Sequence, residues 1–206
     1  MILYKFKVVV FEEFLTANET DRLIQLGYDS GYERSSNVGS ANPDGTFKAS
    51  VGDGRTSYNA WCLEECHSDP VVQAITHRIA EITGIPEINS EYLQLLKYDV
   101  GQYYEEHHDY IQFHLERPCG PRLLTFFLYL SDVEEGGGTK FSNLNLVVEP
   151  KKGKALLWPN TYDHDPSKKD SITYHEALPV LQGKKYAANA WLHLRDFKTP
   201  MEKACS

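Results

Sequence analysis

Cysteine is scarce in this sequence, and long apolar runs are missing from it. The four cysteines among its 206 residues are Cys62, Cys66, Cys119 and Cys205. They are too few for a disulfide scaffold, and no pair has the Cys-x-x-Cys spacing of a structural zinc site. Cys62 and Cys66 would be neighbours on one helical turn, but the sequence leaves open whether they are bonded. No apolar run approaches ~18 residues, so we expect no membrane span.

Basic residues are also too few to give the chain a positive balance. It has 21 lysine and arginine residues against 29 aspartate and glutamate residues, and its formal net charge is −8. Because a nucleic-acid backbone needs a basic face, we expect no nucleic-acid partner. Segment 1–14 lacks the small-residue cleavage site of a signal peptide. The compartment stays open between the cytoplasm and, for a trimmed chain, the endoplasmic reticulum or secretory pathway.

The sequence does contain enough apolar material for a core, since hydrophobic residues make up 41% of it. Segment 4–11, YKFKVVVF, predicts a strand. A short amphipathic helix is predicted from a cap at Thr16 to about residues 28–31. A second helix is predicted with Ser68 as its cap, Pro70 in its first turn and Gly84 at its end. Its apolar stripe consists of Val71, Val72, Ile75, Ile79 and Ile82.

Two further regions differ from these segments in amino-acid composition. Segment 31–57 is dense in glycine, serine, asparagine and aspartate, and a loop of this length is usually either a functional lid or disordered. From residue 91 onward, β-type runs alternate with turns. We predict one domain over 1–206, mainly β with flanking N-terminal helices. In it, 1–90 supplies helical support and the lid loop 31–57, and 91–197 forms a sandwich or barrel core.

The stretch YYEEHHDY, residues 103–110, is the first candidate for a metal site. On a strand, His107 and Asp109 point to the same face, while His108 points away. Two histidines and one carboxylate form the facial triad that holds non-haem Fe(II) with open coordination positions. The second histidine must come from elsewhere, and His175 is the best candidate, with His164 as the alternative. Taken alone, a His-x-Asp tripeptide is more often part of a solvated strand.

We next expect a positively charged side chain in the pocket near the iron. Open positions on iron suit a 2-oxo acid, whose distal carboxylate then needs a positive partner in the pocket. Alternation along 185–191 places Lys185, Ala187, Asn189 and Trp191 on one face, with Lys184 on the other. A lysine that points inward is costly unless it meets an anion. The alternative is that both lysines are turn residues in water.

These pieces together resemble the prolyl 4-hydroxylases of the Fe(II)/2-oxoglutarate-dependent dioxygenases. The resemblance runs from about residue 11 to 197. It is most specific in YLQLLKYDVGQYYEEHHDY, TFFLYLSDVEEGGGTKF, PKKGKALLW and HEALPVLQGKKYAANAWLH. The resemblance implies a double-stranded β-helix, or jelly-roll, core. Departures from the family pattern at Ala177, at Tyr186 and in the long loop before His175 concern the choice of substrate.

The resemblance implies a role for each matching residue. His107, Asp109 and His175 would bind the metal, and Lys185 would complete the catalytic set by holding the distal carboxylate of 2-oxoglutarate. Further co-substrate or pocket-lining positions are Tyr98, Tyr129 and Thr139. Positions implied on the substrate side are Tyr104, Arg55, Thr56, Ser57 and Trp191. The implied cofactors are Fe(II), 2-oxoglutarate and O2, with ascorbate to rescue oxidised iron.

The activity that the resemblance implies is 4-hydroxylation of proline in a peptide or protein. Tyrosines near the site suit an aromatic groove for a polyproline II segment, although they also suit the packing of a barrel. Two alternatives remain within the enzyme class: a free amino acid as substrate, or another side chain such as lysine. A non-enzymatic β-sandwich binding module is disfavoured by the intact triad together with Lys185.

Overall fold

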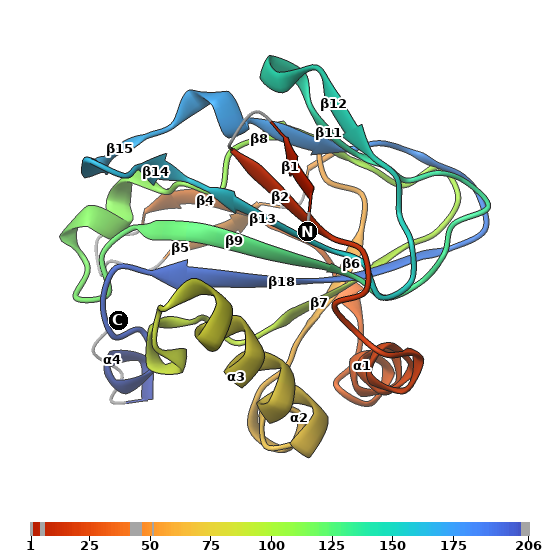
Figure 1. Cartoon of the computed structure of the whole chain (residues 1–206), viewed down its shortest axis with the longest axis horizontal. Helices are drawn as coiled ribbons and strands as arrows, with labels where there is room; N and C mark the ends of the chain where they lie inside the picture. The colour runs from red at the N-terminus through yellow and green to blue at the C-terminus, as the bar shows by residue number, and fades with distance from the viewer. Residues whose placement is uncertain (1, 5–6, 42–46, 51, 203–206) are drawn as a thin grey trace.

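The computed structural model of the chain describes residues 2–4, 7–41, 47–50 and 52–202. Its centre is an antiparallel sheet whose middle strands come from the second half of the sequence (Figure 1). In order across this large sheet lie β1 (Ile2–Tyr4), β2 (Val8–Phe11), β13 (Ala155–Pro159), β9 (Arg122–Tyr129), β18 (Lys185–His193), β7 (Gln94–Tyr98), β6 (Tyr58–Trp61) and β3 (Glu33–Arg34). The mainly β class is confirmed.

A smaller antiparallel sheet lies over one face of the large one and carries much of the site described below (Figure 1). Its strands in order are β12 (Leu146–Val148), β11 (Thr139–Phe141), β16 (His175–Ala177) and β8 (Tyr104–His107). Three separate two-stranded pairs are β4 (Asn37–Ala41) with β5 (Phe47–Ser50), β10 (Glu135–Gly136) with β17 (Val180–Gln182), and β14 (Thr161–Tyr162) with β15 (Asp165–Lys169).

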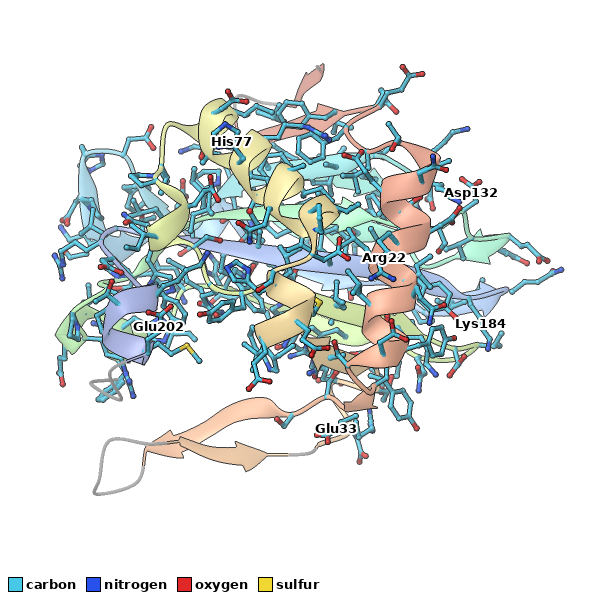
Figure 2. All side chains as sticks on the ribbon, turned by 90° about the horizontal axis from the view of Figure 1, so that it is seen from below. Arg22, Glu33, His77, Asp132, Lys184 and Glu202 are labelled. Atoms are coloured by element: carbon cyan, nitrogen blue, oxygen red, sulfur yellow. A yellow bond between two sulfur atoms is a disulfide. The ribbon has the colours of Figure 1, made fainter. Side chains whose placement is uncertain are left out.

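The opposite face of the large sheet is covered by helices (Figure 2). The α-helices are α1 (Ala17–Asp29), α2 (Glu64–His67), α3 (Pro70–Thr83) and α4 (Lys198–Glu202), and the 3-10 helices are Glu87–Asn89, Gln112–Glu116, Ser142–Leu144 and Ser171–Thr173. Arg22 of α1 donates to the Asp69 carboxylate at the start of α3, with Nε–Oδ2 at 2.9 Å. None of the helices in the described ranges has the length and apolar character needed to cross a bilayer.

Alternation along the central strands builds a separate core on each face. Leu95, Phe126 and Leu128 pack against the helices. Their neighbours Leu96 and Phe127 face the small sheet instead. Each fully buried leucine or phenylalanine contributes about 1.5–3 kcal/mol to folding. The alternation of successive side chains between the two faces of each strand is therefore the direct cause of the layered arrangement.

The helix ends follow local capping chemistry. Thr16 caps α1 in a capping box: its hydroxyl accepts from the Glu19 amide, and the Glu19 carboxylate accepts from the Thr16 amide. Gly84 ends α3 in the left-handed conformation, as predicted. The prediction of Ser68 as the cap of α3 is wrong. Asp69 caps it through its bond to the Val71 amide, because Pro70 occupies the first helical position and the cap is the residue directly before it.

Three other expectations need correction. Ile82 is exposed, so the buried stripe of α3 ends one turn before the helix does. Segment 4–11 is not one strand: β1 and β2 pair as an antiparallel hairpin. Four strands before residue 91 belong to the large sheet, so the core extends beyond 91–197.

The predicted lid segment 31–57 is partly ordered into strands rather than being a plain loop. It contains β3 and the pair β4–β5, which extends away from the body of the two sheets (Figure 2). Residues 42–46 and 51 of this segment lie outside the described residues. Just beyond it, Cys62 and Cys66 form a disulfide that ties the end of β6 to α2, which answers the question that the sequence left open. Cys119 is buried and free.

Candidate functional site

Two adjacent strands of the small sheet bring the predicted triad together. His107 on β8 and His175 on β16 are partners in the antiparallel register. Asp109 lies between them, with its Oδ1 3.7 Å from His107 Nε2 and its Oδ2 3.7 Å from His175 Nε2. The three ligand atoms lie within 4.8 Å of one another. His164 is exposed on the turn between β14 and β15 and does not join the group.

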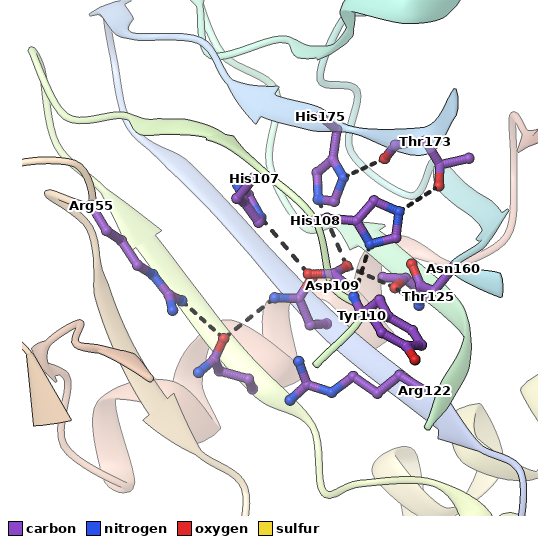
Figure 3. A network of polar contacts seen from close by, with 12 residues as sticks. Arg55, His107, His108, Asp109, Tyr110, Arg122, Thr125, Asn160, Thr173 and His175 are labelled. Carbon is purple, nitrogen blue, oxygen red and sulfur yellow. Dashed lines mark hydrogen bonds and ion pairs between the residues drawn. The ribbon is translucent and has the colours of Figure 1, made fainter. Parts of the chain in front are cut away.

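The reason given for the His107 and Asp109 pairing was only partly right. β8 ends at His107, so Asp109 lies two residues beyond the strand and not on its face. His108 fixes this turn, because its Nδ1 accepts from the Tyr110 amide at 2.9 Å. Its Nε2 lies 3.0 Å from the carbonyl oxygen of Asp170. The turn and not the strand alternation therefore directs the carboxylate between the two imidazoles (Figure 3).

Both triad histidines are held in one orientation by backbone carbonyls. His107 Nδ1 lies 2.8 Å from the Glu105 oxygen, and His175 Nδ1 lies 3.0 Å from the Thr173 oxygen. Because a carbonyl only accepts, each Nδ1 carries the proton, and each Nε2 presents a lone pair to the centre. This is the orientation in which imidazole binds a metal.

Electrostatics also favour the metal-binding protonation states. Burial lowers the pKa of His107, and the neighbouring His175 lowers it further. Burial acts to raise the pKa of Asp109, but His175 and His107 outweigh it and hold the carboxyl well below its usual range. His107 is therefore neutral and Asp109 ionised at neutral pH, as a divalent cation requires of its ligands.

The triad opens into a cavity of about 680 Å³. Its walls include seven other residues that matter here: Tyr98, Tyr104, Thr139, Arg55, Trp191, Gln94 and Arg122. Lys185, Tyr129 and Ser57 have no exposed surface and lie behind this lining. The cavity therefore joins the metal site to most of the residues that the resemblance singled out.

Lys185 lies in an aromatic box without a carboxylate partner. Its Nζ donates to the Gly137 oxygen at 2.7 Å and lies 5.1–5.6 Å from the ring centres of Tyr98, Phe127 and Tyr129. No ion pair joins it to a carboxylate in the described part of the chain. Burial lowers its pKa to about 7. The interpretation of Lys185 as an inward lysine is confirmed, and Lys184 is exposed at 58% of its side chain.

Tyr98 and Thr139 line the cavity near Lys185, and Tyr129 lies behind Thr139. Tyr98 is the register partner of Lys185 across β7 and β18. Tyr129 Oη donates to Thr139 Oγ1 at 2.6 Å, and Thr139 faces the cavity. Burial raises the pKa of both tyrosines. Both remain protonated at neutral pH. Because Tyr129 gives its one hydrogen to Thr139, the donor that this pair presents to an anion in the cavity is the Thr139 hydroxyl.

Comparison with known proteins agrees with this arrangement. A model of the 2OG-Fe(II) oxygenase superfamily matches residues 93–193, which include the triad and Lys185. Prolyl 4-hydroxylase subunit alpha-1 of Rattus norvegicus is 34% identical over 201 residues, or 94% of this chain. Prolyl 4-hydroxylase subunit alpha-2 of Gallus gallus is 38% identical over 144 residues, or 68% of the chain. The chain belongs to the prolyl 4-hydroxylase family of the 2-oxoglutarate oxygenases.

Solved structures give the same result for the fold. The collagen prolyl hydroxylase of Paramecium Bursaria Chlorella virus-1, solved as a 2-oxoglutarate complex, superposes with a TM-score of 0.72 at 28% identity over 91% of this chain and 96% of that one. A prolyl 4-hydroxylase of Pseudomonas putida gives 0.59 at 16% identity, with 91% of this chain and 92% of that one covered, and supports the fold alone. The predicted jelly-roll core is confirmed. The chain spans between about a quarter and about a third of the length of the curated relatives it matches.

Family membership makes Fe(II), 2-oxoglutarate and O2 the cofactors of this site, and the residues present suit them. Two oriented imidazoles and an ionised carboxylate are the donors that ferrous iron takes. A buried ammonium without a carboxylate partner suits the far end of a dicarboxylate. The assignment of each residue to its ligand remains a prediction.

On the side of the predicted substrate contacts, segment 52–57 is joined to β8. Arg55 and Tyr104 form an isolated antiparallel bridge, and the Glu105 amide donates to the Gly54 oxygen at 2.8 Å. The Arg55 guanidinium lies 4.7 Å above the Tyr104 ring and donates to Gln94 Oε1 at 3.0 Å. Tyr104 in turn stacks on His107, with ring centres 3.6 Å apart. Segment 52–57 therefore contacts the residue next to the triad.

The sequence analysis missed a buried ionic cluster beside Trp191 in this prolyl 4-hydroxylase fold. Arg122 lies 3.7 Å above the Trp191 ring and forms two hydrogen bonds with the Glu91 carboxylate, at 2.5 and 3.0 Å. His193 Nε2 lies 2.8 Å from Glu91 Oε1, and its Nδ1 lies 2.7 Å from the Gly120 oxygen. The alternation that places Lys185 inward reaches His193 when it is continued along the strand, and this signal could have found the cluster.

Glu91 is the carboxylate that both cationic side chains of this cluster share. We therefore expect Glu91→Gln to lower the free energy of unfolding by about 3–5 kcal/mol, as for a broken buried ion pair. Burial raises its pKa, but Arg122 and His193 lower it to about 2. Burial lowers the pKa of His193, but hydrogen bonds with Cys119 and Glu91 raise it to about 9. The stability that Glu91 contributes is therefore lost as pH falls from 4.5 towards 2. The stability that His193 contributes is lost as pH rises from 6.5 through 9.

Urea denaturation at pH 6 measures this effect. The matched control is Glu81→Gln on α3, whose side chain is 67% exposed, and it should change stability by less than about 0.5 kcal/mol. If Glu91→Gln and Glu81→Gln lost equal amounts of unfolding free energy, the buried cluster would not contribute the expected stability.

Proposed function

We propose that this chain 4-hydroxylates proline in peptides or proteins, with His107, Asp109 and His175 holding Fe(II) and Lys185 holding the distal carboxylate of 2-oxoglutarate. The observation that carries the proposal is that the oriented triad lines a cavity whose wall includes Tyr98, and that the buried Lys185 Nζ, which has no ion pair in the described residues, lies 5.1 Å from the centre of the Tyr98 ring directly behind this wall. When bound, Fe(II) and 2-oxoglutarate supply the oxidation, in which one oxygen atom of O2 goes to succinate and the other to a substrate C–H bond, with release of CO2.

The protein's own contribution is position and exclusion of water. Backbone carbonyls hold the Nδ1 protons of His107 and His175, so that each Nε2 lone pair stays at the centre. Tyr98 and the Tyr129–Thr139 pair offer hydroxyl groups beside Lys185. The aromatic box keeps water from the far carboxylate, and this strengthens its bond with the ammonium. Ascorbate remains a prediction, as does the absence of a nucleic-acid partner.

The other end of the cavity suits an extended peptide that contains proline. Trp61 at the rim is partly exposed, and its ring lies 6.1 Å from that of Trp191. Aromatic faces of this kind bind polyproline II segments at low entropic cost. Arg55 and Arg122 provide donors for main-chain carbonyl groups along such a segment. A free amino acid would leave this end of the cavity unfilled, so a peptide is favoured.

The test is oxidation of a panel of proline-rich peptides with Fe(II) and 2-oxoglutarate, followed by mass spectrometry and a succinate assay. We expect a gain of one oxygen atom on proline, with one succinate for each hydroxyl group. The same peptides with alanine in place of proline are the control. Oxidation of free proline or of lysine peptides alone would favour the alternatives, and no peptide-dependent succinate from any of them would remove the proposal.

A further inference from the structure

A chain of side-chain hydrogen bonds ends on the triad carboxylate from the side away from the cavity. Thr125 Oγ1 lies 2.7 Å from Asp109 Oδ2, and Asn160 Nδ2 lies 2.9 Å from Thr125 Oγ1 (Figure 3). Thr125 and Asn160 are 0% and 1% exposed. Neither was singled out by the sequence. Thr125 lies within β9, and Asn160 directly follows β13.

The direction of every proton in this chain is determined. Thr125 Oγ1 donates its single hydrogen to Asp109 Oδ2 at 2.7 Å. The hydroxyl oxygen must then accept, and Asn160 has to present its NH2 group and not its oxygen. The Asn160 Oδ1 atom is left buried without a hydrogen-bond partner. An amide held in this unfavourable state indicates that the Thr125–Asp109 bond sets its orientation.

The Asn160 backbone reaches the other ligand segment. Its oxygen accepts from the Asp170 amide at 3.0 Å. The preceding Pro159 oxygen accepts from Thr173 Oγ1 at 2.8 Å. Thr173 provides the carbonyl that orients His175. Residues 159 and 160 thus contact both Thr125, which bonds to the Asp109 carboxylate, and Thr173, which orients the His175 imidazole.

We propose that Asn160 and Thr125 are positioning residues for the metal centre: Asn160 locks the Thr125 hydroxyl, and Thr125 fixes the rotation of the Asp109 carboxylate before a metal arrives. This inference rests on the proposed iron site. Partners of this kind typically change metal affinity by about 10–100-fold when they are removed. Asn160 acts on the metal only through Thr125, because its side chain touches no ligand.

The test is calorimetric titration of the metal-free protein with Mn(II), which needs no turnover. Thr125→Val keeps the shape of the side chain and should weaken Mn(II) binding about 10–100-fold, whereas Thr125→Ser should restore it. Asn160→Ala should weaken it less. In the Thr125→Val background, Asn160→Ala should add nothing. The control is Thr76→Val on α3, which removes another buried hydroxyl, one bonded to the Gln73 oxygen, and it should leave Mn(II) binding unchanged.

The outcomes separate the two proposals. Wild-type affinity in Thr125→Val, or an additive effect of Asn160→Ala in that background, overturns the positioning role and leaves the iron site standing. No Mn(II) binding by the wild-type protein overturns the iron site itself and the positioning role with it. A general loss of structure in Thr125→Val would appear in thermal denaturation, and Asn160→Ala then gives the decision: unchanged Mn(II) affinity overturns the inference.

Discussion

Asp109→Ala is expected to abolish succinate formation and metal binding, and His107→Ala to do the same. Asp109 is the only anionic ligand of the triad, and its pKa is held low enough for it to be charged at any physiological pH. Without it, two imidazole side chains remain, which is too few donors for stable ferrous iron. We expect turnover to fall by at least about 100-fold, a loss typical even of partners that only support a metal ligand.

Succinate release and Mn(II) titration, each with thermal denaturation of the metal-free protein, measure this result. His164→Ala is the matched control, because His164 was the alternative ligand and is exposed away from the triad. It should leave both readouts unchanged. Activity that survives in Asp109→Ala, or that disappears in His164→Ala, would refute the ligand assignment.

Lys185→Met is expected to raise the 2-oxoglutarate concentration needed for half-maximal turnover by about 30-fold or more. Removing one partner of a buried charge pair costs about 2–5 kcal/mol of binding. Methionine is chosen because it fills the aromatic box without a charge. Lys184→Met is the control on the exposed neighbour. An unchanged requirement in Lys185→Met would remove Lys185 from the co-substrate site.

The same substitution has a second consequence for stability in the absence of co-substrate. Burial lowers the Lys185 pKa from 10.5 to about 7. Between these values the unfolded chain binds the proton and the folded chain does not, so this group makes stability rise as pH increases from 7 to 10.5. Lys185→Met should abolish that rise, and denaturation at pH 7 and pH 10 would show it. A bound dicarboxylate should also remove this rise, since it raises the pKa of Lys185 again and keeps the ammonium charged.

The central strands, the helix cap at Thr16 and the His-x-Asp pair could be predicted because each rests on a local pattern. The runs at 122–133 and 185–197 alternate so that their faces are fixed before any tertiary contact forms. Lys185 could be found in the same way, since a lysine on an apolar face has few explanations. His175 was preferred over His164 by its place between a loop and a β run, and register pairing with His107 is the reason that His175, and not His164, lies in the group.

Other features depend on contacts between distant segments. Glu91, Arg122 and His193 come from three parts of the chain, and none of them looks unusual without the others. Thr125 looks like any β-propensity residue until the Asp109 turn lies beside it. Asp69 and Ser68 are both good caps, and only the helical position of Pro70 decides between them. For the lid, composition indicated irregular structure and did not show the strands within it.

The antiparallel bridge between Arg55 and Tyr104 fastens the segment after the β4–β5 hairpin to the edge strand of the smaller sheet. That strand ends in His107. A displacement of this segment therefore reaches His107, which we propose as an iron ligand, through a single strand. Given the proposed ligand role, reciprocity ties the two binding equilibria: whatever factor a bound metal adds to the affinity for a peptide, a bound peptide adds to the affinity for the metal.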